Sequence, residues 1–214
     1  MIRCVVFDFD GTLVDSNLIK RQIFLSMASR DGEELLMKEI LETQPGDRNE
    51  VFNKFAASRT GIGKAEGRLS AAQMVLEYTY SCEEAIAICP EMVGASKILD
   101  ELKHEGFQLA VNSATPTETL HRIVSRRGWL SHFTHVLGSP ASKAENIVSI
   151  VDDLSLQNKE VVMVGDRCID QNAATEFGCP FIGIICADSD FGVPPQYFIN
   201  ALEQLPSELK RLMT

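Results

Sequence analysis

Two aspartates, Asp8 and Asp10, end the first apolar run of the sequence, with one residue between them. Side chains two apart on a strand point to the same side, so both carboxylates can face one pocket. Gly11 follows directly and allows a sharp turn whose backbone N–H groups can approach an anion. A lone acidic pair of this kind is more often a polar turn than a site, so its meaning depends on the other strand ends.

Further polar groups follow three later apolar runs. They are, in chain order, the Ser113 hydroxyl with the Ala114 amide, the Lys143 amine, and the Asp166 and Asp170 carboxylates. Open α/β sheets bind their ligands at the carboxyl ends of the strands. Chance could supply any one of these groups, but the whole set indicates a single site.

This set of groups favours phosphoryl transfer through an aspartyl phosphate. A carboxylate nucleophile, here Asp8, divides one difficult displacement into two easier ones. Asp10 would protonate the leaving oxygen and then take a proton from the attacking water. The polar groups of Ser113, Ala114 and Lys143 would bind the transferring oxygens, whose charge must be stabilised in the transition state.

The same chemistry requires a hard cation, because a phosphate and a carboxylate repel each other. Mg²⁺ takes oxygen ligands and keeps several of its waters. The sequence therefore predicts Mg²⁺ as the cofactor, held by Asp8, the backbone carbonyl of Asp10, and Asp166.

Five short apolar runs are expected to form the strands that position these groups. They are nearly continuous rather than alternating, which is typical of parallel strands covered on both faces. The runs are residues 2–7, 107–112, 134–137, 160–164 and 181–186. Helical patterns lie between them, so the sequence predicts an α/β fold with a doubly wound, mostly parallel, five-stranded Rossmann-like sheet.

One interval is far longer than a single crossover helix requires. About a hundred residues separate the first and second apolar runs, and residues 16–90 carry helical apolar spacing throughout. We therefore expect a catalytic core of residues 1–15 and 91–214. An all-helical cap of residues 16–90 would be inserted after the first strand.

Composition and charge exclude several classes of partner. The chain is 45% hydrophobic and 23% charged, as in an ordinary globular protein. Its formal net charge of −10 argues against a nucleic-acid or anionic-membrane surface, since both require clustered Lys and Arg. No stretch approaches the roughly 18 apolar residues of a membrane span, and the six cysteines form no CxxC. We expect a reduced, cytoplasmic protein whose partner is a small phosphorylated metabolite.

The chain resembles the haloacid dehalogenase (HAD) superfamily, in its phosphoglycolate-phosphatase-like branch with a helical cap after the first strand. The resemblance spans the whole chain and rests on four motifs, which are DxDGT[LV]xDS at Asp8 to Ser16, a strand-ending Ser at Ser113, a Lys at Lys143, and GDxxxD at Asp166 and Asp170. The context of Lys143 lacks the proline of the family's usual SKP.

The resemblance implies a HAD-like fold, the aspartyl-phosphate mechanism, Mg²⁺, and a cap that closes over the leaving group. It also implies that Asp170 contacts the metal through water or orients Lys143. Aspartate at position 10 favours a phosphatase or a phosphomutase over a dehalogenase, because a halide leaves without protonation.

The leading hypothesis is a Mg²⁺-dependent phosphatase of a small soluble phosphomonoester. The alternatives are a sugar phosphomutase, a phosphonate-cleaving relative, and a non-catalytic module that binds phosphate and Mg²⁺ for regulation. The cap would determine the substrate, although most charges on such helices form a solvated face. The basic cap residues that could contact an anionic leaving group are Arg48, Lys54, Arg59 and Lys64.

Overall fold

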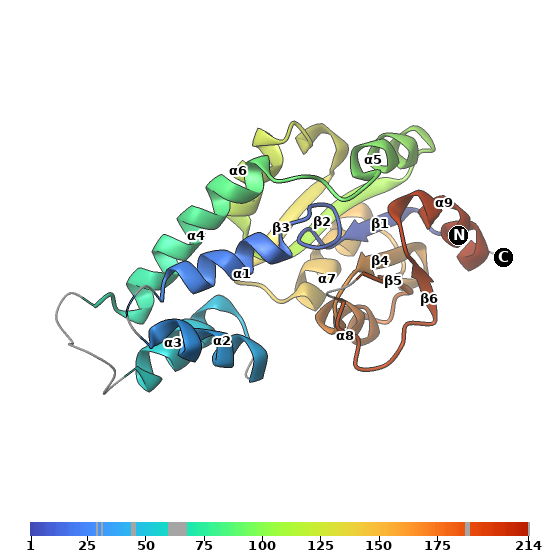
Figure 1. The fold of residues 1–214 in the computed structure, drawn as a ribbon. Helices are drawn as coiled ribbons and strands as arrows, with labels where there is room; N and C mark the ends of the chain where they lie inside the picture. The colour runs from blue at the N-terminus through green and yellow to red at the C-terminus, as the bar shows by residue number, and fades with distance from the viewer. Residues whose placement is uncertain (29, 31, 44–45, 60–67, 187–188, 214) are drawn as a thin grey trace. The chain divides into compact units, whose positions relative to one another are not determined.

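The computed structural model describes residues 1–214 except 29, 31, 44–45, 60–67, 187–188 and 214 (Figure 1). Internal contacts divide the chain into two units. The first comprises Met1–Asn17 and Ala87–Thr214, and the second comprises Leu18–Ile86. The second unit is therefore an insertion between the first two strands of the first unit.

The first unit contains a six-stranded sheet in which every pairing of neighbouring strands is parallel. The strands are β1 (Cys4–Phe7), β2 (Gln108–Pro116), β3 (His135–Ser139), β4 (Val161–Gly165), β5 (Phe181–Ile184) and β6 (Tyr197–Ile199). Their order is β3-β2-β1-β4-β5-β6. The chain leaves β1 toward β2 but leaves β4 toward β5, so the strand order reverses between β1 and β4. Ligands of such sheets bind at this switch point.

The predicted doubly wound α/β fold is confirmed, but the sheet has six strands rather than five. The additional strand, β6, has only three residues, of which Ile199 alone is buried while Phe198 is exposed. A short edge strand of this kind lacks the continuous apolar run that marks a strand covered on both faces. The sequence prediction missed it for that reason.

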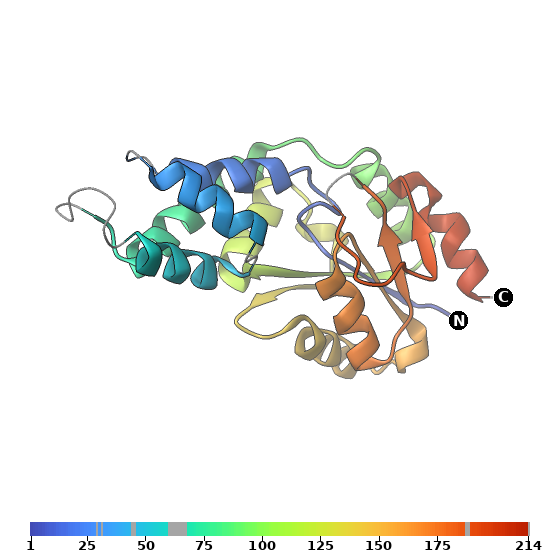
Figure 2. The same ribbon diagram turned by 60° about the horizontal axis from the view of Figure 1, so that its bottom comes forward.

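Helices cover both faces of this sheet (Figure 2). On one face lie α7 (Lys143–Leu154) and α8 (Cys168–Phe177), where Cys4 and Val6 of β1 share a buried cluster with Ile147 and Ile150. On the other face lie α5 (Ala95–His104) and α9 (Leu205–Met213). The remaining helices of this unit are α6 (Thr117–Arg126), which packs on β2 and β3, and the short η1 (Leu130–His132), η2 (Asn158–Glu160) and η3 (Leu202–Gln204).

The inserted unit is helical, as predicted. Its helices are α1 (Asn17–Ser26), α2 (Glu33–Thr43), α3 (Arg48–Ser58) and α4 (Ala71–Ile88), of which α1 and α4 begin or end at the boundary with the first unit. Three aromatic rings pack together in this unit, where Phe24 stacks on Tyr78 with ring centroids 4.1 Å apart and Phe52 contacts both rings. Among the described residues, none of the helices combines the length and the apolar character that crossing a membrane requires.

Candidate active site

Three aspartates meet at the switch point between β1 and β4. Asp8 follows β1, Asp166 follows β4, and Asp170 lies in the first turn of α8. One carboxylate oxygen of each lies within 4.8 Å of those of the other two, and all three residues are at most 5% exposed. Burying carboxylates costs free energy unless they are paired or bind a metal, so this cluster needs positive charge.

Lys143, the first residue of α7, supplies one positive charge to this cluster. Its Nζ lies 2.7 Å from Oδ1 of Asp8 and 2.5 Å from Oδ1 of Asp170. A capping box defines where the helix begins, because the Ser142 hydroxyl accepts the N–H of Glu145 and the Glu145 carboxylate accepts the N–H of Ser142. The local sequence therefore places Lys143 at the start of the helix that faces the aspartates.

Burial and neighbouring charges shift the pKa values of Asp8, Asp166 and Lys143. Burial, followed by the charge of Asp170, raises the pKa of Asp8 to about 8, although Lys143 opposes the shift. Burial and Asp170 also raise the pKa of Asp166 to about 6. Burial by itself would lower the pKa of Lys143, but Asp170 and Asp8 outweigh it and raise that pKa. Three carboxylates beside one ammonium leave surplus negative charge, which is the electrostatic setting of a divalent-cation site.

We expect the metal-free protein to lose stability as the pH rises. The folded pKa values of Asp8 and Asp166, about 8 and about 6, exceed the ordinary value of 3.8. Between pH 3.8 and these folded values, the folded chain therefore binds more protons than the unfolded chain. The stabilisation is complete below the unfolded pKa and is lost as the pH rises through the folded values. Urea midpoints in EDTA at pH 5 and pH 8 check this, with Asp8→Asn as the control that should show a weaker dependence. A wild-type midpoint that rises with pH would contradict the expectation.

Asp10 lies among hydroxyl groups. Ser16 Oγ donates to its Oδ1 at 2.6 Å, and the hydroxyls of Ser113 and Thr115 lie 3.4 Å from its Oδ2. Ala114, between these two, is exposed. The sequence prediction includes Ser113 and Ala114 but not Ser16 or Thr115. The alternation of an extended strand could have indicated Thr115, since it stands two positions after Ser113.

The hydroxyls of Ser113 and Thr115 lie where β2 is irregular. The pairing of β2 with β3 shifts register within residues 112–116. The two strands approach so closely here that a Cβ at Gly138 would lie 1.9 Å from the carbonyl oxygen of Thr115. Bulges of this kind re-aim side chains beside active sites. The close approach explains why β3 carries a glycine at this position.

Asp166 has two further side-chain partners, which come from the turn after β1 and from the start of α1. Thr12 Oγ1 donates to one of its carboxylate oxygens and Asn17 Nδ2 donates to the other, both at 3.3 Å. Gly11 allows this approach, because its φ is +78° and a Cβ there would lie 2.3 Å from Asp166 Oδ2. Asp170 accepts the N–H of Arg167 at 3.1 Å with the oxygen that does not face Lys143. The turn after β1 and the start of α1 thus hold the Asp166 carboxylate, whereas the backbone just before α8 holds that of Asp170.

The basic residues predicted to contact a leaving group lie in the inserted unit. Arg59 is buried there, where it donates to a backbone carbonyl and lies 5.3 Å from the ring centroid of Phe55. Arg48 donates to a threonine hydroxyl at 3.1 Å, and Lys54 is half-buried. Lys64 lies outside the described residues. Both arginines thus have partners within their own unit, and a substrate role for these four side chains stays a prediction.

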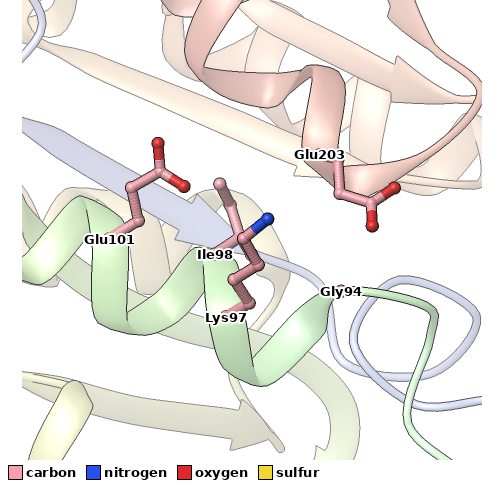
Figure 3. A pocket seen from close by; sticks show the side chains of 5 residues that line it. All are labelled: Gly94, Lys97, Ile98, Glu101 and Glu203. Carbon is pink, nitrogen blue, oxygen red and sulfur yellow. The ribbon is translucent and has the colours of Figure 1, made fainter.

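A small cavity elsewhere in the first unit shares no residue with the carboxylate cluster (Figure 3). Its volume is about 30 Å³, and its lining is Gly94, Lys97, Ile98, Glu101 and Glu203. A cavity of this size holds water but no substrate of several heavy atoms. This cavity is therefore no substrate site.

Comparisons with known proteins agree with this geometry. The family model described as haloacid dehalogenase-like hydrolase matches residues 5–184. The phosphoglycolate phosphatase of Psychrobacter arcticus is 24% identical over 194 residues, which cover 84% of this chain and 82% of the relative.

Two solved structures are similar in fold. The protein YfnB of Bacillus subtilis, solved with bound magnesium, has a TM-score of 0.74 at 19% identity and covers 97% of this chain and 98% of its own. CbbY of Rhodobacter sphaeroides, solved with phosphate, has a TM-score of 0.73 at 19% identity, with 98% and 100% covered. The resemblance inferred from the four motifs is confirmed, and the chain belongs to the family of haloacid dehalogenase-like hydrolases.

Proposed function

We propose that this protein is a Mg²⁺-dependent phosphatase that hydrolyses a small soluble phosphomonoester through an aspartyl-phosphate intermediate. The observation that carries the proposal is the buried cluster at the switch point. There Lys143 contacts Asp8 and Asp170 while Asp166 completes a group of oxygen ligands. A potential nucleophile, a cation for the transferring phosphoryl group and a set of metal ligands thus occupy one place.

The environments of the first two aspartates support different roles for them. Asp8 is buried against Lys143, whereas Asp10 is half-buried among hydroxyls. In the proposed reaction, an Asp8 oxygen attacks phosphorus while Asp10 gives its proton to the leaving oxygen. Asp10 then takes a proton from water, which attacks the aspartyl phosphate and releases phosphate and the free Asp8 carboxylate. Two carboxylates of one motif can divide the work in this way because their surroundings differ.

Binding of the transferring oxygens would come from groups around the two aspartates. The Lys143 ammonium, the Ser113 hydroxyl and the Ala114 amide are the donors that we assign to this task. They act best where charge develops in the transition state. Lys143 already faces Asp8 in the free protein, so the phosphoryl group would meet a cation that is in place.

The donor set fits Mg²⁺, which prefers carboxylate and carbonyl oxygens. Burial, and after it the neighbouring negative charge of Asp170, raises the pKa values of Asp8 and Asp166, and a divalent cation would offset both effects. We assign Asp8, Asp166 and the backbone carbonyl of Asp10 as its ligands. Asp170 has one oxygen 2.5 Å from Lys143, which supports a role in orienting that lysine. When bound, the ion reduces the repulsion between Asp8 and the phosphate.

The substrate class and location are also part of the proposal. A relative that matches most of the chain is a phosphoglycolate phosphatase, which supports a small anionic phosphomonoester as substrate. The net charge of −10 favours such a metabolite over a nucleic acid or an anionic membrane. The six cysteines, all of them among the described residues, form no disulfide, which supports the reducing cytoplasm as the location.

Removal of Mg²⁺ tests the proposed function directly. We expect phosphate release from a panel of small phosphomonoesters, including an aryl phosphate, to fall at least about 100-fold after EDTA treatment, because the uncompensated carboxylates repel the substrate. Adding Mg²⁺ back should restore it, and phosphate release measured by a colorimetric assay gives the readout. A folded protein that hydrolyses none of the panel with Mg²⁺, or hydrolyses it equally in EDTA, would contradict the proposal.

A further inference from the structure

Two buried asparagines connect the beginning of α7 to the sheet. Asn112 lies in β2 and is fully buried, and Asn146 lies on α7 and is 4% exposed. Neither belongs to the carboxylate cluster. Burying an amide costs free energy unless its groups are hydrogen-bonded, so the bonds of this pair show what it holds in place.

The pair forms a chain of hydrogen bonds that ends on the backbone of Lys143. Asn146 Nδ2 donates to the Gly138 carbonyl at 3.2 Å and to Asn112 Oδ1 at 3.0 Å, which uses both of its N–H groups. Asn112 Nδ2 in turn donates to the Lys143 carbonyl at 2.8 Å. The first residue of α7 is thereby tied to β2, and the first turn of the helix is tied to β3.

These hydrogen bonds between helix and sheet fix the position of the Lys143 backbone relative to the sheet, which the capping box does not. The capping box of Ser142 and Glu145 determines where the helix begins, but both of its partners belong to the helix end itself. The asparagine bonds instead cross from the helix to the sheet, over 31 residues for the bond from Asn112 to Lys143. They therefore determine where the backbone of Lys143 lies relative to the strands that carry the aspartates.

The lysine side chain needs such a reference point. Its four-carbon stem is flexible, and ordering it costs conformational entropy. Its Nζ nevertheless lies between Oδ1 of Asp8 and Oδ1 of Asp170, at 2.7 and 2.5 Å, with the residue only 7% exposed. If the backbone of Lys143 moves, the ammonium cannot keep both contacts without rearranging its stem.

We propose that Asn112 and Asn146 are positioning residues that hold the Lys143 ammonium between Asp8 and Asp170. The catalytic consequence rests on the proposed phosphatase function, whereas the geometric consequence does not. Displacing a reacting group by about 1 Å can lower a rate about 100-fold. Loss of the pair should therefore lower kcat about 10- to 100-fold and change KM by less than about threefold, since the lysine acts mainly on charge that develops in the transition state.

The test uses the double variant Asn112→Leu/Asn146→Leu. Leucine has the same number and branching of side-chain heavy atoms as asparagine, and replacing both partners together leaves neither amide half-satisfied, which limits the loss of stability. The milder variant Asn112→Ser, whose short hydroxyl does not replace the amide bond to Lys143, serves if the double variant does not fold. Asn158→Ala is the matched control, because Asn158 Nδ2 also donates to a backbone carbonyl, at 2.7 Å, but far from the lysine in sequence and at an exposed position.

The first readout is independent of activity. The folded, metal-free proteins are treated briefly with acetic anhydride, and acetylation of Lys143 is measured by peptide mass spectrometry relative to the exposed Lys159. We expect the ratio to rise about tenfold or more in the asparagine variants, because the buried amine becomes accessible. It should not change in Asn158→Ala. The second readout is the pair of kcat and KM values with Mg²⁺ for an aryl phosphate.

The outcomes separate the two proposals. Increased labelling of Lys143 supports the positioning role, even if neither wild type nor variant hydrolyses a phosphomonoester, in which case only the phosphatase proposal fails. An active wild type with folded variants that keep its labelling ratio and its kcat would overturn the positioning role. The positioning role would also be overturned if the variants were less stable than the wild type but kept its labelling ratio and its kcat. The asparagines would then serve only to hold the fold together.

Discussion

Asp8→Asn is expected to abolish phosphate release, lowering kcat at least about 10⁴-fold. An amide is a poor nucleophile, so the aspartyl phosphate cannot form at a useful rate. The substitution keeps the size of the side chain and removes a carboxyl whose pKa is raised to about 8 by burial and by the charge of Asp170. The variant should therefore stay folded and, without metal, be at least as stable as the wild type at pH 8.

The measurement combines phosphate release with urea unfolding of the same preparations. Asp152→Asn is the matched control, since it makes the same change at an exposed position on α7. It should keep the wild-type kcat. Hydrolysis by a folded Asp8→Asn protein at a rate near that of the wild type, with contaminating phosphatase excluded, would mean that another group is the nucleophile.

Lys143→Met is expected to affect both activity and stability. Methionine fills a similar volume but leaves the carboxylates of Asp8 and Asp170 without the ammonium that lies 2.7 and 2.5 Å from them. Removing one partner of a buried ion pair typically costs about 3–5 kcal/mol, because an uncompensated charge remains. The rate should also fall about 10³-fold or more, since a preorganised cation no longer faces the transferring phosphoryl group.

The effect on stability should depend on pH. Lys143 lowers the pKa of Asp8, so its loss raises that pKa further above the unfolded value of 3.8. The folded variant then binds a proton that the unfolded chain releases, and acidification stabilises it. Lys143 also lowers the pKa of Asp166. The deficit relative to wild type should therefore grow as the pH rises above the wild-type folded values of Asp166 and Asp8, about 6 and about 8, and urea unfolding in EDTA at pH 5 and pH 9 measures it. Lys159→Met, at an exposed position, is the control. An equal deficit at both pH values would contradict this account of the cluster.

The sequence alone predicted the doubly wound α/β class, the helical insertion and the polar groups that follow the strands. Continuous apolar runs mark strands covered on both faces, and helical spacing over residues 16–90 marks the insertion, because both patterns are local. Asp8, Lys143, Asp166 and Asp170 could be grouped because parallel strands end at the same edge of a sheet. The short strand β6 could not be predicted, because its pairing with β5 stabilises it and its own three residues carry no comparable pattern.

The supporting polar contacts were decided by the tertiary structure. Asn17 reaches Asp166 across 149 residues of sequence, Thr115 reaches Asp10 across 105, and Asn146 reaches Asn112 across 34. An asparagine or threonine reads in sequence as a polar residue of a turn or helix, and whether it is buried depends on which elements pack against it. The groups that we propose to react can thus be named from local sequence, whereas their orientation depends on hydrogen bonds between segments that only the folded chain brings together.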